Sequence, residues 1–420
     1  MTHFETIAAP YVSPPSGSVA ILRDDTEAIA VARELAAEFA AGAAERDRQR
    51  RLPWEEVERF SRSGLWGISV PKEYGGAGVS NVTLAEVTAI LAAADSSIAH
   101  IPQNHFYSLE VLRVGGSEAQ KRYFYNLALQ GQRFGNALAE IGHKDFKRRT
   151  RLSRDAEGRL RIDGRKYYCT GSLFAHWIPT LAVDDEGSGW LVFVPRQSYG
   201  VTVVDDWDGF GQRVTGSGSV IFADVPVQDD WVVPFKASFD RPTTIGPLAQ
   251  IIHAALDLGI AKGAYAAALD FVRQHSRAWI DSGVARASDD PLILERVGDL
   301  SVRLSAAEAL LRRAGRVLDA SQAAPDERSV AAASVAVAEA RVLTTENALM
   351  AGSKLFELGG SGVKGTEFKL QALKAAGWKY GKMTPYGSYP KLAAEAFNRI
   401  RNALARSSDR EQLIQSLQTQ

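Results

Sequence analysis

Residues 206–227 have the sequence DWDGFGQRVTGSGSVIFADVPV, and this segment carries the clearest information about the fold. It carries four glycines before Ser219, and these end any regular element and let the backbone turn. The apolar run of residues 219–222 that follows is typical of a short strand. Similar short runs, separated by Gly, Asp and Pro, precede it at residues 190–194 and 200–204. Together they predict a small antiparallel barrel or sandwich that ends near Pro234.

The alternating pattern extends upstream of this stretch. Leu160 and Ile162 alternate with arginines, as expected for a strand with one buried face. Asp163 and Gly164 follow, and this dipeptide is typical of a two-residue hairpin because it tolerates positive φ. The sequence therefore predicts a hairpin turn at these two residues, with a return strand over residues 165–169.

The segments on both sides of the strands have helical periodicity. Residues 24–48 are rich in Ala and Glu and carry apolar side chains at helical spacing. Thr83 and Glu86 have the spacing of a capping box and predict the start of another helix. Residues 329–350 are rich in alanine, which allows close helix packing. Before them, apolar residues recur in steps of four and three, at Leu300, Leu304, Ala307, Leu311, Ala314 and Leu318.

Helices, then strands, then helices predict an α+β fold that is mainly α. The absence of alternating strand-helix units in the pattern argues against a doubly wound nucleotide-binding sheet. We expect an N-terminal helical domain over residues 20–131, a middle antiparallel β-barrel over residues 132–238 and a C-terminal helical bundle over residues 239–360. Residues 361–420 are expected to form an atypical C-terminal tail.

The composition excludes several classes of partner. The chain has 49 basic and 49 acidic residues, so it lacks the basic field that attracts nucleic acid or anionic lipid. Cys169 is the single cysteine and the seven histidines are scattered, so we expect neither disulfides nor a metal site. The sequence shows no signal peptide and no apolar window of about 18 residues, which favours the cytoplasm and no membrane contact.

Several separated motifs resemble those of the acyl-CoA dehydrogenase superfamily, over roughly residues 20–360. Residues 71–78, PKEYGGAG, resemble the PxxYGGxG bend, and residues 163–171, DGRKYYCTG, resemble GxKxWITN. The stretch of residues 206–227 resembles the DW, GxR, TxSGS and FxDVxVP elements. Residues 100–106, HIPQNHF, are similar to the SfnB-type sulfur-acquisition enzymes, whose branch includes dibenzothiophene monooxygenase. The resemblance implies the acyl-CoA dehydrogenase fold and a flavin cofactor.

The resemblance also implies which residues contact the flavin. Thr170 corresponds to the hydroxyl-bearing residue that meets the flavin ring edge, unless it only ends a strand. Asn136 offers an amide to the flavin or substrate, or makes ordinary strand hydrogen bonds. Trp207 packs beside the flavin or in the barrel core. Ser217 and Ser219 contact the cofactor or only bond within their own turn.

Two further positions come from the same resemblance. Asn104 and His105 are implied on the substrate side of the flavin, although the residues alone favour a capping or core role for such histidines. Arg277 lies near the position from which an arginine reaches a flavin phosphate, with Arg273 as the alternative and a solvated helix charge as the simpler interpretation. The predicted catalytic set is Asn104, His105, Asn136 and Thr170. The predicted cofactor set is Asn136, Thr170, Trp207, Ser217 and Arg277.

The function that the resemblance implies is a reduced-flavin monooxygenase. Such an enzyme would use reduced FMN, supplied by a separate flavin reductase, together with molecular oxygen to oxidise a small organosulfur compound in sulfur acquisition. FAD is the alternative cofactor. The resemblance also implies a homotetramer. Two other hypotheses stay open, an acyl-CoA dehydrogenase with FAD and a non-catalytic flavin-binding homologue. The second arises because the relatives carry a flavin-proximal histidine in a DRHWRNxRTHTLHDP segment, whereas no histidine follows His275 here.

Overall fold

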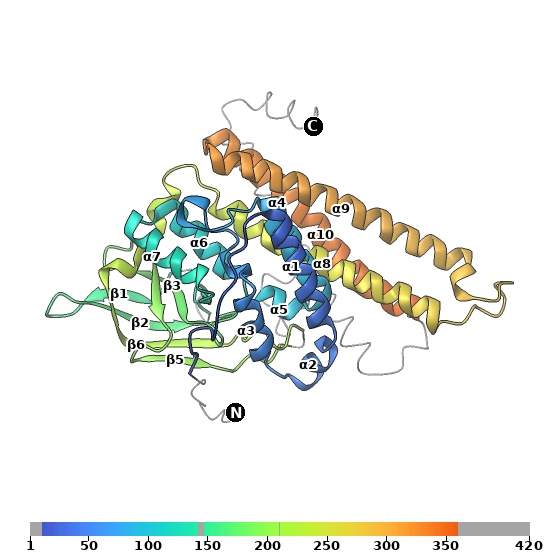
Figure 1. The fold of residues 1–420 in the computed structure, drawn as a ribbon, viewed down its shortest axis with the longest axis horizontal. Coiled ribbons are helices and arrows are strands. Elements are labelled where there is room, and N and C mark those ends of the chain that lie inside the picture. Colours follow the sequence, from blue (N-terminus) through green and yellow to red (C-terminus); the bar gives the residue numbers. More distant parts are fainter. Residues whose placement is uncertain (1–10, 142–146, 210, 360–420) are drawn as a thin grey trace.

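The computed structural model describes residues 11–141, 147–209 and 211–359, and within them helices come first, then a sheet, then three long helices (Figure 1). This order confirms the predicted α+β, mainly α fold. The first group comprises α1 (Asp25–Ala40), α2 (Ala43–Gln49), α3 (Trp54–Arg62), α4 (Asn81–Ala94), α5 (Ser96–His100), α6 (Gln103–Gly115) and α7 (Glu118–Leu129).

The helices begin where a side chain satisfies the backbone N–H groups of the first turn. Asp24 caps α1 by accepting a hydrogen bond from the Glu27 N–H at 2.9 Å. The hydroxyl of Ser80 caps α4 by accepting from the Thr83 N–H at 3.2 Å. The predicted start at Thr83 is therefore wrong by one turn, because Ser80 offers the same chemistry three residues earlier. Ser117 starts α7 with a complete capping box.

The middle part is a curled sheet of seven strands in the order β5-β6-β2-β1-β3-β4-β7. All neighbouring strands pair antiparallel except β1 and β3, which meet in parallel. The segment 134–139 forms bridges to β3 and to Tyr167, directly after β2, so it lies between these two strands. The strands are β1 (Arg151–Arg154), β2 (Leu160–Lys166), β3 (Trp177–Val183), β4 (Gly189–Pro195), β5 (Val201–Val204), β6 (Ser219–Val227) and β7 (Val232–Pro234).

The predicted hairpin at Asp163 and Gly164 is wrong, because β2 runs straight through both residues. Gly164 is required because Thr150 packs closely against its backbone, and the chain does not turn there. A Cβ on Gly164 would lie 2.7 Å from the Cα of Thr150, and the register against β6 shifts between Ile162 and Gly164, as in a β-bulge. The turn that joins β1 to β2 lies at residues 155–158.

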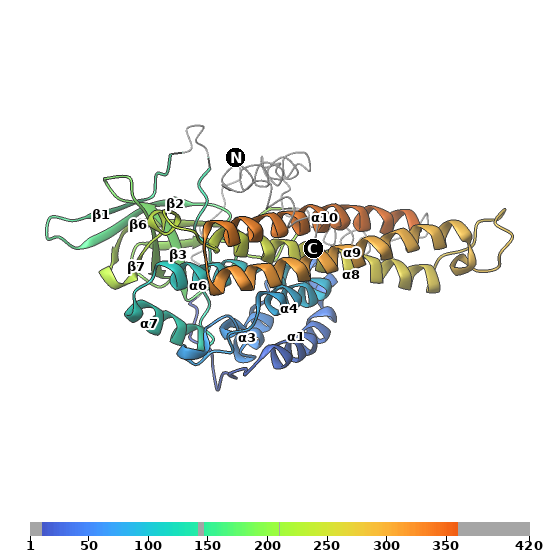
Figure 2. The same ribbon diagram turned by 90° about the horizontal axis from the view of Figure 1, so that it is seen from above.

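Three long helices form the last part, and they lie side by side (Figure 2). They are α8 (Ile245–Gln274), α9 (Pro291–Ala323) and α10 (Glu327–Gly359). All six predicted core positions of α9 are buried, which confirms the bundle: Leu300, Leu304, Ala307, Leu311, Ala314 and Leu318.

The bundle is held against the N-terminal helices by a contact between backbones. A Cβ on Gly259 of α8 would lie 2.4 Å from the Ala89 carbonyl oxygen of α4, and one on Gly263 would lie 2.6 Å from that of Ala93. Any side chain at either position would push α4 and α8 apart. The two glycines therefore fix the distance between the first and last parts of the fold.

Among the described residues, the larger of two buried hydrophobic clusters runs through all three parts. It contains Leu84 of α4, Val220 of β6 and Leu256 of α8. Because the core is shared, the predicted boundaries at residues 131, 238 and 360 stay predictions. None of the described helices combines the length and the apolar composition that crossing a bilayer requires.

Candidate functional site

The site begins where the chain leaves β2 and meets the loop before β6. The Cys169 N–H donates to the Gly218 carbonyl at 2.9 Å, and the Gly171 N–H donates to the Thr215 carbonyl at 3.0 Å. These bonds bring Thr170 beside Ser217, with 2.8 Å between their hydroxyl oxygens. Two residues of the predicted cofactor set, 47 positions apart in the sequence, therefore lie next to each other.

Thr215 extends this contact into a row of three buried hydroxyls. Its Oγ1 lies 2.6 Å from the Ser217 Oγ and 3.1 Å from the Gln212 carbonyl oxygen, to which it donates. We call Thr170, Ser217 and Thr215 the hydroxyl row. Its members are at most 1% exposed, so the row is shielded from water. A buried row of this kind presents neutral groups that donate or accept.

Trp207 is fixed next to the hydroxyl row. Its Nε1–H donates to the Gln212 carbonyl at 3.1 Å, and its ring meets the Tyr168 ring edge to face at 6.3 Å. Gln212 and Tyr168 both have positive φ, 49° and 55°. Such conformations are costly for residues other than glycine and concentrate at functional sites. Trp207 is 8% exposed, so its indole is both packed and hydrogen-bonded.

Asn136 lies close to the hydroxyl row, and its hydrogen bonds go to Tyr168, Leu138 and Ser172. Its Nδ2 donates to the Tyr168 carbonyl at 3.4 Å, and its Oδ1 accepts from the Leu138 N–H at 3.2 Å. Its backbone N–H and carbonyl both bond the Ser172 hydroxyl, at 2.9 Å each. The half-buried Asn136 amide therefore stabilises the backbone turn at Tyr168.

His105 is in the core. It is 0% exposed, its Nε2 donates to the Trp66 carbonyl at 2.8 Å, and its Nδ1 accepts from the Phe134 N–H at 3.1 Å. Burial lowers the pKa of this imidazole to about 3, so it is neutral at physiological pH. The neighbouring Asn104 donates to the Gly135 carbonyl at 2.6 Å. Both residues thus tie α6 to the segment that carries Asn136.

Two other histidines, His100 and His253, lie at the site, and neither is among the residues predicted from the sequence. The His100 Nδ1 is 2.8 Å from the Gln212 Oε1, and the His100 and His253 rings meet edge to face at 5.7 Å. A Cβ on Gly171 would lie 3.0 Å from the Ile101 carbonyl, which puts the end of α5 against the hydroxyl row. His253 sits in an apolar stretch of α8, where the residue type was the only available signal.

Ser219 has a different role from Ser217. Its N–H and its hydroxyl both donate to the carboxylate of Asp206, at 2.7 and 2.8 Å. This pair of hydrogen bonds to one side chain closes the loop between β5 and β6. For Ser219 the structure thus shows the turn contact that was its alternative interpretation.

Arg277 lies far from the hydroxyl row within this chain. It follows the C-terminal end of α8, and residues 253 and 274 of that helix are separated by about 30 Å at 1.5 Å per residue. Arg277 and the alternative Arg273 line the same cavity of about 430 Å³, together with Trp279 and Arg286. The structure places the two alternatives side by side and does not bring either of them to Thr170.

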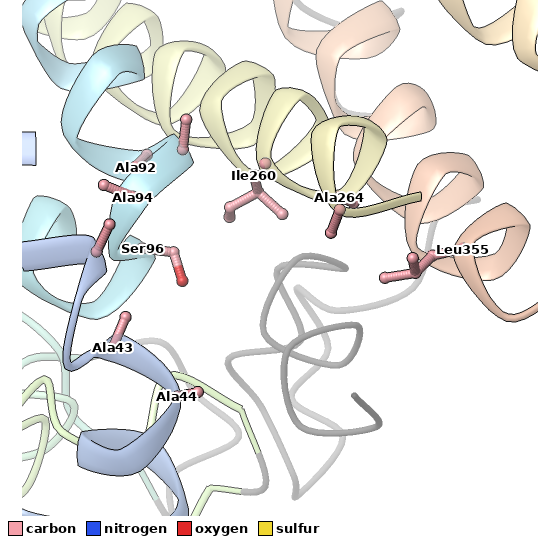
Figure 3. Close-up of a pocket in the computed structure, with 12 residues that line it drawn as sticks. Ala43, Ala44, Ala92, Ala94, Ser96, Ile260, Ala264 and Leu355 are labelled. Carbon is pink, nitrogen blue, oxygen red and sulfur yellow. The ribbon is translucent and has the colours of Figure 1, made fainter. Parts of the chain in front are cut away.

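A smaller cavity of about 210 Å³ lies between α2, α4, α8 and α10 (Figure 3). Alanines make up most of its wall, and among the residues that line it Ser96 alone has a polar side chain. Ligand pockets usually exceed about 300 Å³ and carry several converging polar groups. This cavity therefore lacks both the size and the donors for a flavin ring.

A buried ion pair lies behind the site. The Lys166 ammonium, 0% exposed, bonds the Glu140 carboxylate at 2.7 Å. Glu140 also accepts from the N–H groups of Arg149 and Thr150, at 2.7 and 3.1 Å. Burial lowers the pKa of Lys166 to about 8, against the opposing effect of Glu140. The pair joins the strand end near Thr170 to the segment of Asn136, so it holds both sides of the site together.

Comparison with known families and proteins agrees with this geometry. Residues 24–132 match the N-terminal domain of acyl-CoA dehydrogenase, and residues 251–371 match its C-terminal domain. Dibenzothiophene monooxygenase of Rhodococcus erythropolis is 32% identical over 360 residues, which are 81% of this chain and 85% of that protein. A probable FMNH2-dependent monooxygenase of Pseudomonas putida, SfnC, is 32% identical over 344 residues, 80% of this chain and 85% of that protein.

A solved structure shares the same arrangement. FMN-bound TdsC from Paenibacillus sp. A11-2 superposes with a TM-score of 0.82 at 28% identity and covers 89% of this chain and 96% of its own. The similarity thus extends through the helical, strand and bundle parts alike. The chain belongs to the acyl-CoA dehydrogenase superfamily, in the branch that contains dibenzothiophene monooxygenase.

Proposed function

We propose that this chain is a reduced-flavin monooxygenase that oxygenates a small organosulfur compound. The observation that carries the proposal is the buried hydroxyl row beside Trp207, in a fold shared with FMN-bound TdsC. FMN is the proposed cofactor, because relatives are named for FMNH2 or bind FMN, and FAD is the alternative. A cytoplasmic location, where a reductase supplies reduced flavin, is part of the proposal.

The residues at the site fit a flavin ring by their chemistry. The N5 atom of a flavin accepts a hydrogen bond when oxidised and donates one when reduced. Because Thr215 donates to the Gln212 carbonyl, Ser217 donates to Thr215 and Thr170 donates to Ser217. The Thr170 oxygen therefore serves as an acceptor, which suits the N5–H of a reduced flavin. Trp207 offers a flat apolar face that excludes water. Asn136 is a positioning residue, because it holds the Tyr168 turn.

The proposed overall reaction converts one organic sulfide, one oxygen molecule and one FMNH2 into one sulfoxide, one FMN and one water molecule. Reduced FMN, when bound, supplies the two electrons that divide the oxygen molecule. One oxygen atom becomes bonded to sulfur and the other leaves as water. The protein orients the sulfur compound, keeps bulk water out of the site and guides protons. Asn104 and His105 take part as supports of the wall beside Asn136.

A second subunit completes the cofactor site in this proposal. The Arg273 and Arg277 cavity is too far from Thr170 to act on the same flavin within one chain. Beside it Trp279 and Ile280 are 70% and 88% exposed, which suits a surface that another subunit covers. Arginine binds phosphate through two parallel N–H groups. A homotetramer in which Arg277 reaches the FMN phosphate of a neighbouring subunit accounts for both features.

The test is a titration of the purified protein with oxidised and reduced FMN and FAD, followed by mixing with oxygen-18 gas and organosulfur compounds. The expected result is tighter binding of reduced FMN and one labelled oxygen atom in a sulfoxide or sulfone product. Failure to bind any flavin in either redox state contradicts the proposal. Anaerobic bleaching of bound FAD by an acyl-CoA would instead establish a dehydrogenase, and flavin binding without product a non-catalytic homologue.

The variant Thr170→Val tests the role of the hydroxyl row. It keeps the shape of the side chain and removes both the proposed hydrogen bond to the flavin and the bond to Ser217, so Kd for reduced FMN should rise by about 10-fold. Thr202→Val on β5 is the matched control and should leave Kd unchanged. Equal binding by wild type and Thr170→Val would show that the flavin edge lies elsewhere.

A further inference from the structure

Helix α2 contacts both walls of the candidate site. One wall is α5, because the Ile101 carbonyl that follows this helix lies against Gly171, next to the hydroxyl row. The other wall is the segment between β5 and β6 that contains Trp207. We call this segment, residues 205–209 and 211–218, the Trp207 loop. The contacts of α2 therefore fix how the two walls lie relative to each other.

A buried ion pair joins α2 to the first wall. The Arg46 guanidinium bonds one carboxylate oxygen of Asp95 through Nε and Nη2, at 3.2 and 2.9 Å, and both residues are at most 3% exposed. The other carboxylate oxygen accepts from the N–H groups of Ser97 and Ile98, at 3.0 and 3.2 Å, and so caps α5. The position at which α5 begins is thus tied to α2.

Arg50 joins α2 to the start of the Trp207 loop. Its guanidinium forms two hydrogen bonds with the Asp205 carboxylate, at 3.0 and 2.6 Å, and donates a third to the Trp207 carbonyl at 3.1 Å. Arg50 ends α2 in the left-handed conformation, with a φ of 53°. Glycine would adopt this conformation without strain, so the arginine is kept here at a cost to the backbone.

Arg213 makes the reciprocal contact, from the loop back to the helix. Its guanidinium donates to the carbonyl oxygens of Asp47 and Arg48, at 3.1 and 3.2 Å. Carbonyl oxygens in the last turn of a helix carry partial negative charge, so a cation is favoured there. The loop is therefore fastened to α2 at two points, residues 205–207 and residue 213.

Trp207 is held from two directions by this arrangement. Arg50 binds its carbonyl oxygen, and its indole N–H donates to the carbonyl of Gln212, the residue before Arg213. A movement of either fastening point would therefore shift the indole.

We propose that α2 positions Trp207 over the flavin, with Arg50 and Arg213 as the positioning residues. This rests on the proposed function. A loop that is already held in place loses little further freedom when a ligand binds, so the two arginines raise the affinity for the flavin. They also keep the indole against the ring. A loosened loop admits water, and the electrons of reduced FMN then end in hydrogen peroxide in place of the sulfur product.

The test compares Arg50→Met, Arg213→Met and the double variant with wild type. Arg154→Met is the matched control, because Arg154 also bonds one carboxylate, that of Asp229, and one backbone carbonyl, that of Gly158. Each protein is assayed for the Kd of reduced FMN, for the fluorescence of oxidised FMN at saturation, and for hydrogen peroxide relative to product. Trp207→Leu gives the fluorescence of bound FMN without the indole.

Each single variant should raise Kd for reduced FMN by roughly 10-fold, the size of one charge-assisted hydrogen bond. Bound FMN should be quenched in wild type, because the indole covers the ring, and should become brighter in both variants, with at least twice the peroxide. The double variant should be within about 3-fold of the weaker single variant, because both arginines act through one loop. Arg154→Met should behave as wild type.

The outcomes separate this inference from the proposed function. If wild type binds no flavin, the proposed function fails. If wild type binds flavin and both single variants bind it equally well, the inference alone fails. It also fails if bound FMN is as bright in wild type as in Trp207→Leu, or if Kd rises with fluorescence and peroxide unchanged, because that pattern marks a purely structural role.

Independent effects, with a Kd about 100-fold higher in the double variant, would likewise overturn the shared role of the loop. Should an arginine variant not fold, Asp205→Asn weakens the Arg50 contact from the other side. Unchanged Kd and fluorescence in Asp205→Asn would then refute the inference.

Discussion

Replacing Lys166 by methionine is the sharpest test of what holds the site together. The Lys166 side chain is 0% exposed and its Nζ lies 2.7 Å from the carboxylate of Glu140, which is 10% exposed. Burial alone would raise the pKa of Glu140, but Lys166 and two backbone N–H groups reverse this and lower it from 4.5 to about 2. At about 1.4 kcal/mol per pKa unit, the net effect of burial and these partners favours the carboxylate by roughly 3 kcal/mol.

Lys166→Met keeps the volume of the side chain and removes only the charged partner. The N–H groups of Arg149 and Thr150 remain, and the burial cost of the Lys166 charge, which lowers the pKa of that lysine to about 8, disappears. We therefore expect a loss of about 2 kcal/mol at pH 7, below the usual cost of breaking a buried pair. Because the pKa of Glu140 is lower in the folded protein than in the unfolded chain, this stabilisation is present above pH 4.5 and is lost as the pH falls toward 2.

The assay is urea unfolding at fixed protein concentration, followed by tryptophan fluorescence and by circular dichroism. Lys262→Met is the matched control, because the Lys262–Glu308 pair is 38% and 35% exposed and its loss should cost at most about 1 kcal/mol. The double variant Glu140→Gln/Lys166→Met should recover part of the loss of Lys166→Met. A Lys166→Met protein as stable as the control, with no change in the effect between pH 7 and pH 3, would refute the reasoning.

Gly259→Ala should destabilise the protein by more than about 1 kcal/mol, because its Cβ would lie 2.4 Å from a carbonyl oxygen of α4. Gly298→Ala is the control: its Cβ would meet nothing within 4 Å, so it should stabilise the protein by about 0.5–1 kcal/mol through helix propensity. Thermal unfolding of both variants measures the two changes. Leu311→Ala should cost about 2–5 kcal/mol in urea unfolding, because Leu311 is 4% exposed, and Leu294→Ala on the same helix, 54% exposed, should change stability by less than about 0.5 kcal/mol. The His105 ring, with a pKa of about 3, should keep constant NMR shifts from pH 8 to pH 5, and a titration within that range would contradict its core assignment.

The sequence predicted the features of the fold that depend on periodicity. The spacing of Leu304, Leu311 and Leu318 placed one face of α9 in the core, and all three are buried. Predictions from short sequence patterns were wrong where contacts with distant residues determine the backbone conformation. The Asp163–Gly164 dipeptide favours a turn by itself, but here the close approach of Thr150 uses the glycine inside a strand.

The site was predicted in part, and through resemblance more than through chemistry. The match to family motifs selected Thr170, Ser217 and Trp207, which lie close together in the structure, and their contacts with a flavin stay predictions. No local pattern shows that His253 faces His100, because this depends on the rotation of α8 against α5. The position of Gln212 could not be predicted either, since its side chain contacts His100, which lies 112 positions away in the sequence.

The left-handed conformations of Tyr168 and Gln212 have a consequence for engineering this protein. Each costs about 1–3 kcal/mol that a glycine would not incur, so a selection for heat resistance alone would favour glycine at both positions. Glycine at Gln212 would discard the amide that orients His100, and at Tyr168 the ring that meets Trp207. Glycine at either position would therefore relieve backbone strain and remove a contact of the candidate site, and libraries built for stability should leave both positions unchanged.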